Sequence, residues 1–186
     1  MSSEQRVASS EHADSEVERV APNALSWFDS DEKIALLEAD ALSWVRTPFI
    51  ENCAVKGRNG GVSCHTLAAA IYRAVGFLPS DFTPPRGYVH KLTKSAPEAI
   101  LDFVDADPSV AGLFSRVEDL KVPLPGDLIA LKHGGESESA DVLKHLGIVL
   151  PQRRFVHVLR VIGVRISSLD DVTYAEHIAA LRRPLS

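Results

Sequence analysis

One cysteine and two histidines have the residue types of a nucleophilic catalytic site. Cys64 stands where an apolar helical pattern begins, and the positive potential of a helix N-terminus favours a thiolate there. The general base for a cysteine is usually a histidine distant in sequence, and His145 and His157 both lie in later apolar runs. These residues predict attack of a thiol on a carbonyl carbon, with backbone N–H groups near Cys64 as the oxyanion hole.

The two histidines have the spacing needed to meet across a β-hairpin. Residues 151–153, Pro-Gln-Arg, are typical of a turn between strands at 145–150 and 154–159. In this register His145 opposes residue 159 and lies diagonally from His157, with both side chains on one face. One imidazole can therefore orient the other.

Apolar periodicity predicts the elements that must position these residues. A helix is expected at about 30–45, starting near the capping-box pattern of Asp29 and Glu32, and a second from Cys64 to Val75, closed by Gly76. Four sequential antiparallel strands are expected at 127–132, 145–150, 154–159 and 163–169. A closing amphipathic helix is expected at 171–181. This order favours an α+β domain with its helices on one face of an antiparallel sheet.

The chain divides into an N-terminal tail and one domain. Residues 1–22 contain five acidic residues and two arginines, and their few aliphatic residues predict a disordered acidic tail. Residues 23–186 are expected to form a single domain. Within it, the Pro-rich section 77–125 is typical of an insertion or lid, with helical candidates at 96–104 and from Asp107-Pro108 onward.

Composition excludes several classes of partner. The 20 Lys and Arg against 25 Asp and Glu leave a net charge of −5, which disfavours nucleic acid and anionic membranes. No apolar run is long enough to span a membrane, and the N-terminus lacks the pattern of a signal peptide. We therefore expect a protein that is cytoplasmic as synthesised, with particle-borne, lysis-released and muropeptide-recycling roles left open.

Several short motifs resemble the NlpC-type (NlpC/p60) cell-wall cysteine peptidases, most closely their phage-tail-associated members. The similarity covers about residues 35–170 and rests on Trp44-Val-Arg-Thr-Pro-Phe49, Gly61-Val-Ser-Cys64, Pro125-Gly-Asp-Leu-Ile129, His145-Leu-Gly-Ile-Val149 and Phe155-Val-His157. It implies a papain-like fold in which the nucleophile helix packs on a central antiparallel sheet. It also implies Cys64 as nucleophile, His145 as general base and His157 as the residue that orients the base.

The resemblance further implies a substrate and no cofactor. The expected reaction is hydrolysis of the amide between D-γ-glutamate and a diamino acid in peptidoglycan stem peptides or muropeptides. Trp44, Ser63 and His65 are further candidates for the substrate or oxyanion site. Ser63 and the pair His65-Thr66 depart from the residues that usually flank the family's cysteine.

Other functions remain as alternatives. The same scaffold could transfer the acyl group to an amine or alcohol, or could be a catalytically silent module that binds wall peptide or assembles a tail-like particle. A zinc site made of Cys64, His65, His145 and His157 lacks the usual ligand spacing, so no metal is expected. We expect Cys64 to be partly ionised below neutral pH and Cys53 to be a free thiol, with a Cys53–Cys64 disulfide as the open alternative.

Overall fold

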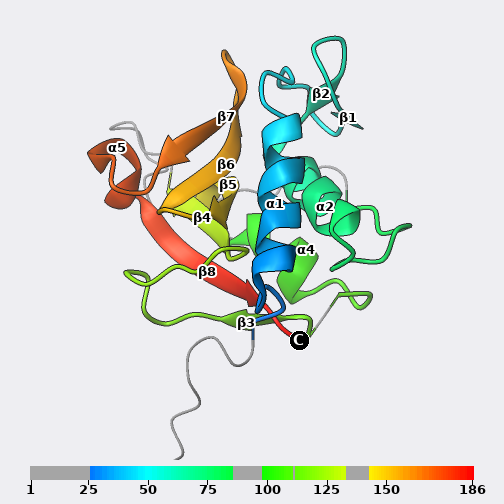
Figure 1. Cartoon of the computed structure of the whole chain (residues 1–186). Helices are drawn as coiled ribbons and strands as arrows, with labels where there is room; N and C mark the ends of the chain where they lie inside the picture. Colours follow the sequence, from blue (N-terminus) through cyan, green and yellow to red (C-terminus); the bar gives the residue numbers. More distant parts are fainter. Residues whose placement is uncertain (1–25, 86–97, 111, 133–142) are drawn as a thin grey trace, which may run out of the picture.

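The computed structural model describes residues 26–85, 98–110, 112–132 and 143–186. Two helices dominate its N-terminal half, α1 (Asp31–Ser43) and α2 (Cys64–Ala74), and two shorter ones follow, η1 (Ala99–Leu101) and α4 (Asp102–Asp105) (Figure 1). None of the helices in these ranges is long and apolar enough to cross a membrane. The predicted tail at 1–22 lies outside the described residues.

Local sequence explains the limits of the two main helices. The Ser30 side chain caps α1 by accepting a hydrogen bond from the Lys33 backbone N–H. The N-cap is therefore Ser30, one residue after Asp29, which the capping-box pattern indicates. Helix α2 is buried on nearly all sides from His65 to Tyr72, as expected of a core helix. It is followed by Gly76, whose φ of +81° few other residues adopt.

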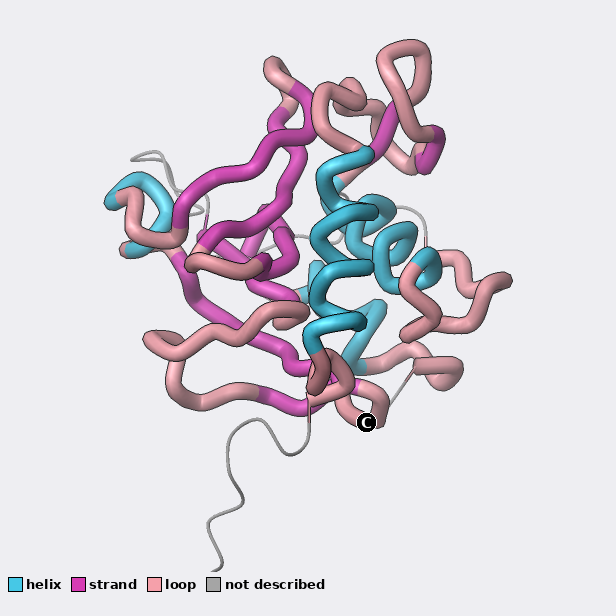
Figure 2. Tube along the Cα trace, viewed as in Figure 1, coloured by secondary structure: helices cyan, strands magenta, loops and turns pink. Residues whose placement is uncertain are grey.

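The centre of the molecule is a six-stranded antiparallel sheet (Figure 2). Its strands are β3 (Phe114–Arg116), β4 (Leu128–Lys132), β5 (Leu143–Leu150), β6 (Arg154–Leu159), β7 (Gly163–Ser168) and β8 (Ile178–Pro184), in the order β3-β8-β4-β5-β6-β7. A separate two-stranded ribbon of β1 (Ala54–Val55) and β2 (Gly61–Val62) precedes α2. The α+β class and the four sequential strands β4 to β7 are confirmed.

Side chains alternate between the two faces of the sheet and fill two cores. On one face, Leu128 and Ala130 join the large core formed with α1 and α2. On the other, Ile129 and Leu131 join a smaller core with Phe155. The period of two therefore decides which strand residues lie under the helices and which lie on the opposite face.

The C-terminal helix predicted at 171–181 is wrong. Only α5 (Val172–Ala175) is helical, and the chain then forms β8, which lies between β3 and β4. Strand β8 continues past the end of the predicted helix, and its two arginines are buried: Arg182 pairs with Asp105, and Arg183 with Asp127. The two ion pairs offset the cost of burying the guanidinium groups, so both arginines can lie in a strand between two others.

The section 77–125 differs from its predicted local structure in two places. Residues 107–110 form a turn, in which the Asp107 carboxylate accepts from the backbone and hydroxyl of Ser109, and not the helix predicted from Asp107-Pro108. Residues 114–116 form the edge strand β3, which the sequence pattern did not indicate. Residues 86–97 lie outside the described ranges, and the role of the section as an insertion or lid stays a prediction.

Candidate active site

Cys64 is the first residue of α2, and two polar residues hold its loop-to-helix junction. The Ser63 backbone N–H donates to Thr66 Oγ1 at 2.9 Å, and the Thr66 hydroxyl donates to the Cys53 carbonyl oxygen at 2.5 Å. Ser63 and Thr66 thus form a capping arrangement that ties the start of α2 to the preceding loop. These residues, which depart from the family pattern, have a structural reason to be there.

The charge state of Cys64 differs from the sequence-based expectation. Burial raises the pKa of the Cys64 thiol, although backbone N–H groups of Leu146, His65 and Cys64 itself favour the thiolate. A helix terminus contributes about 0.3–1 kcal/mol, less than the 1.36 kcal/mol that one pKa unit represents, so burial can outweigh it. The direction of this shift argues against the expected ionisation below neutral pH, which stays a prediction for titration of the thiol.

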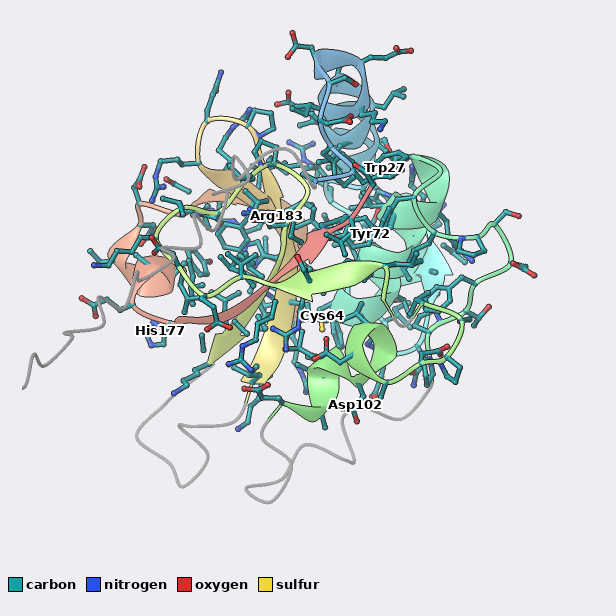
Figure 3. The ribbon with its side chains drawn as sticks, turned by 90° about the horizontal axis from the view of Figure 1, so that it is seen from below. Trp27, Cys64, Tyr72, Asp102, His177 and Arg183 are labelled. Carbon is teal, nitrogen blue, oxygen red and sulfur yellow. The ribbon has the colours of Figure 1, made fainter. Side chains whose placement is uncertain are left out.

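The Leu146 contact places the Cys64 sulfur beside the strand that carries His145. Leu146 follows His145 in β5 and presents its backbone N–H toward the sulfur. In Figure 3, the Cys64 sulfur is drawn near the middle of the view, and the residue is only partly buried. The structure thereby brings the start of α2 and the first half of β5 together, although Cys64 and Leu143, where these elements begin, are 79 residues apart in the chain.

His145 and His157 meet across the β5–β6 hairpin as their spacing predicts. Gly147 pairs with His157, which puts His145 on the diagonal, and His145 Nε2 lies 2.8 Å from His157 Nδ1. The imidazole planes are nearly perpendicular, at 77°. His145 uses Nε2 for this contact, so Nδ1 is the ring nitrogen on its other side.

Sequence reasoning missed the other partner of His157. Ser167 on β7 places its hydroxyl oxygen 2.9 Å from His157 Nε2. Ser167 pairs with Phe155, two residues before His157, so the β6–β7 register could have identified it as a diagonal neighbour. The rings of Phe155 and Tyr174 also pack on His157, at centroid distances of 4.5 and 5.2 Å.

His157 should make the stability of the protein sensitive to acid. Its side chain is fully buried, and burial, followed by the charges of His145 and Arg165, lowers its pKa to about 3. The folded protein then keeps His157 neutral, while the unfolded chain protonates it below about pH 6.5. The free energy of unfolding should fall as the pH drops from about 6.5 toward 3, by up to about 1.4 kcal/mol per pH unit from this residue.

Urea unfolding at pH 7.5, 6.0 and 5.0 measures this dependence. The variant His157→Asn lacks the titrating ring, so its unfolding free energy should decline less steeply over the same range, whatever its stability at pH 7.5. Identical slopes for the two proteins would show that His157 does not resist protonation in the folded state.

The three weaker candidates lie in structural positions. Trp44 is buried in the core, and its indole N–H donates to Asp40 Oδ2 at 3.1 Å, at the end of α1. His65 is buried, with Nδ1 3.4 Å from Ser63 Oγ, and burial lowers its pKa while Glu51 opposes the shift. These contacts account for Trp44, Ser63 and His65 without a substrate.

The two cysteines are both free, so the Cys53–Cys64 disulfide is absent. Within the described ranges, no group of three or more His, Cys, Asp or Glu side chains is placed to hold a metal ion.

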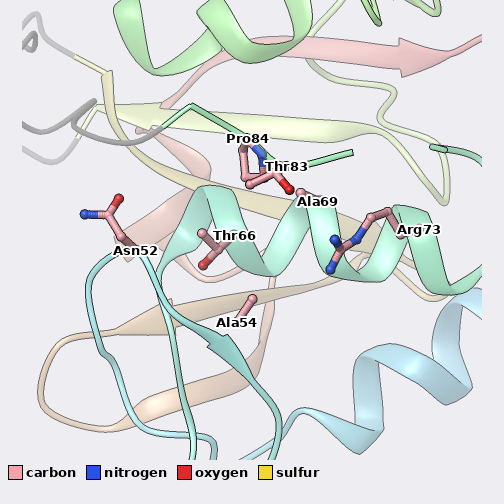
Figure 4. Close-up of a pocket in the computed structure, with 7 residues that line it drawn as sticks. All are labelled: Asn52, Ala54, Thr66, Ala69, Arg73, Thr83 and Pro84. Atoms are coloured by element: carbon pink, nitrogen blue, oxygen red, sulfur yellow. The ribbon is translucent and has the colours of Figure 1, made fainter. Parts of the chain in front are cut away.

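A cavity of about 240 Å³ lies beside the first turns of α2 (Figure 4). Its walls include Thr66, Ala69 and Arg73 from one side of α2, together with Asn52 and Thr83. Arg73 donates to the Phe82 carbonyl oxygen at 3.0 Å, which fixes the guanidinium at the cavity wall. The cavity reaches the capping residue Thr66 but is not lined by Cys64, His145 or His157.

Comparisons with known proteins identify the fold. No family model and no curated protein matches the sequence. Among solved structures, it is similar to an NLP/P60 family protein described as similar to lipoprotein from Staphylococcus aureus, with 18% identity and a TM-score of 0.54, over 84% of this chain and 43% of that one. NlpC2 from Trichomonas vaginalis gives 16% identity and a TM-score of 0.56, over 86% and 50% of the two chains.

A third similar structure is an NlpC/P60 family protein from Bacillus cereus, with 20% identity and a TM-score of 0.51, over 82% of this chain and 40% of that chain. This chain therefore spans half or less of the length of these three proteins. The comparisons confirm the predicted papain-like α+β architecture and the resemblance at the level of the fold. None of the three is described as a phage-tail protein.

Proposed function

Starting from the NlpC/P60 fold of this chain, we propose that it is a cysteine peptidase or amidase that uses Cys64, His145 and His157. The observation that carries the proposal is the 2.8 Å contact between the two imidazoles, beside a helix-terminal cysteine whose sulfur faces the neighbouring Leu146 N–H. This arrangement supports the roles of nucleophile for Cys64, general base for His145 and orienting group for His157.

The proposed reaction proceeds through a thioester. Cys64 Sγ attacks the amide carbonyl carbon while His145 Nδ1 takes the thiol proton, and His145 then returns this proton to the leaving amine. Water, deprotonated by His145, hydrolyses the thioester and restores the thiol.

Backbone groups at the start of α2 support the oxyanion. The N–H groups of Cys64 and His65 already approach the sulfur, so they lie within the region that a bound carbonyl oxygen would enter. Four N–H groups at a helix N-terminus have no partner within the helix and can donate to an anion. The Ser63–Thr66 capping contact holds this turn in place.

For the substrate, we propose the stem peptide of peptidoglycan, cleaved between D-γ-glutamate and the diamino acid. The support is the similarity of motifs and of fold to NlpC/P60 proteins. With its net charge of −5, the chain has no general electrostatic attraction for an anionic polymer, so recognition of the substrate would depend on local contacts at the site.

One observation favours a second candidate, a silent module that binds wall peptide. A nucleophile commonly has a lowered pKa, whereas burial raises the pKa of Cys64. Acyl transfer to an amine or alcohol differs from hydrolysis only in the acceptor of the thioester. Acyl transfer is distinguished from hydrolysis by its product, and the silent module by binding without a product.

Incubation with free tripeptide and tetrapeptide stems, followed by mass spectrometry, tests the proposal. Wild type and Cys53→Ala should both release L-Ala-D-Glu and the complementary diamino-acid fragment, and EDTA should leave the rate unchanged. Binding without cleavage would support the silent module, and an exclusive new ester or amide product would support acyl transfer. Loss of cleavage on chelation would replace the thiol mechanism with a metal-dependent one.

A further inference from the structure

The contact between His157 and Ser167 extends the catalytic pair by one residue. Two consecutive hydrogen-bond contacts join side chains on three neighbouring strands: His145 on β5, His157 on β6 and Ser167 on β7. Ser167 is buried, with 7% of its surface exposed, and its hydroxyl oxygen lies 2.9 Å from His157 Nε2. Each ring nitrogen of His157 therefore has a polar partner.

A neutral imidazole carries a single N–H, so His157 donates at one of its two contacts and accepts at the other. Burial and the charges of His145 and Arg165 lower the pKa of His157 to about 3, which keeps the ring neutral near pH 7. Phe155 and Tyr174 pack against the ring and hold its plane, but ring packing does not decide which nitrogen carries the hydrogen.

The two tautomers of His157 have opposite consequences for His145. When His157 carries its hydrogen on Nε2, its Nδ1 accepts from His145 Nε2–H, and the lone pair of His145 then lies on Nδ1, available to take the Cys64 proton. When His157 carries its hydrogen on Nδ1, it donates to His145 Nε2. Neutral His145 then carries its own hydrogen on Nδ1 and cannot act as a base there.

We propose that Ser167 is a positioning residue whose hydroxyl oxygen accepts the Nε2 hydrogen of His157 and so selects the tautomer that leaves His145 Nδ1 basic. The inference rests on the proposed function for its catalytic consequence. The selection of the tautomer itself is a property of the resting protein and can be measured without a substrate.

A matched pair of variants separates the hydroxyl from the volume of the side chain. Ser167→Thr retains the hydroxyl, and Ser167→Val has nearly the same shape without it. Nitrogen-15 NMR of the ring nitrogens at pH 7.5 should show the hydrogen of His157 on Nε2 in wild type and Ser167→Thr. In Ser167→Val, the Nδ1–H form should appear. Because one neutral hydrogen bond is lost, kcat for stem-peptide hydrolysis should fall about tenfold in Ser167→Val and stay near wild type in Ser167→Thr.

The wild-type spectrum tests the proposal even if a variant does not fold. A His157 hydrogen on Nδ1 in wild type would overturn it, and so would identical tautomers and kcat values in the Thr and Val variants. Failure of the proposed function would give a different result from failure of the tautomer proposal. In that case wild type cleaves no stem peptide, while the His157 tautomer still depends on the Ser167 hydroxyl.

Discussion

Cys64→Ala and His145→Ala should each abolish stem-peptide hydrolysis, with kcat reduced about 10³-fold or more. Alanine at 64 removes the atom that forms the thioester, and alanine at 145 removes the group that accepts and returns the proton. Both variants should still fold, because Cys64 is partly exposed and His145 lies at the partly exposed start of β5. Circular dichroism and urea unfolding provide the check that loss of activity is not loss of structure.

Variants of His157 should lose less activity, and the geometry ranks them. His157 faces His145 through Nδ1, and the side-chain oxygen of asparagine occupies nearly the position of this nitrogen. The side chain of glutamine instead reaches the position of Nε2, which faces Ser167. His157→Asn should therefore keep the contact that orients the base, with a kcat about 10-fold to 100-fold below wild type, and His157→Gln should be slower still.

Comparing the kcat values of these variants tests the assigned roles. If His157→Asn were as inactive as His145→Ala while folded, the roles of base and orienting residue would have to be reversed or abandoned. If Cys64→Ala retained hydrolysis, the thiol would not be the nucleophile. Cys53→Ala is the matched control for removal of a thiol and should keep full activity, since the Cys53 carbonyl that accepts from Thr66 is a backbone group.

The imidazole pair was predictable because hairpin register follows from the turn. Residues 151–153 are a strong turn signal, and once their position is set, the period of two puts His145 and His157 on one face. The starts of α2 and of the strands β4 to β7 were predictable for a similar reason, since each depends on neighbours in the sequence. The meeting of Cys64 with β5 was expected only through the family resemblance.

Three features depended on contacts that local patterns do not contain. Strand β8 replaces the second half of the helix predicted at 171–181, and the burial of its Arg182 and Arg183 depends on the distant partners Asp105 and Asp127. The raised pKa of Cys64 arises from burial by the whole fold, which a helix-terminus argument omits. Ser167 required the register of a further hairpin, between β6 and β7.

The Pro125-Gly-Asp motif has a physical basis in this structure. Gly126 has a φ of +92°, which residues with a side chain rarely adopt. A Cβ at this position would also lie 2.0 Å from the Phe28 ring, so both the backbone conformation and the lack of space exclude a larger residue. Its carbonyl accepts from the Tyr72 hydroxyl at 2.8 Å. The following Asp127 is completely buried and receives two hydrogen bonds from the Arg183 guanidinium, at 2.9 and 2.8 Å. Tyr72 and Arg183 are both labelled in Figure 3.

Asp127→Asn should lower the free energy of unfolding by about 3–5 kcal/mol, because it removes the carboxylate that pairs with the buried Arg183 guanidinium. Asparagine has nearly the volume of aspartate, so loss of packing contributes little. Asp170→Asn is the matched control: Asp170 pairs with Arg153 at 2.7 Å, but the side chains are 64% and 52% exposed, and this change should cost less than about 1 kcal/mol. Adding Arg183→Met to Asp127→Asn should recover much of the loss, since the buried positive charge is then removed as well. Urea unfolding of the four proteins at pH 7.5 measures these differences. Equal effects of the two Asn variants, or no recovery in the double variant, would show that the buried ion pair does not hold β8 to the loop before β4.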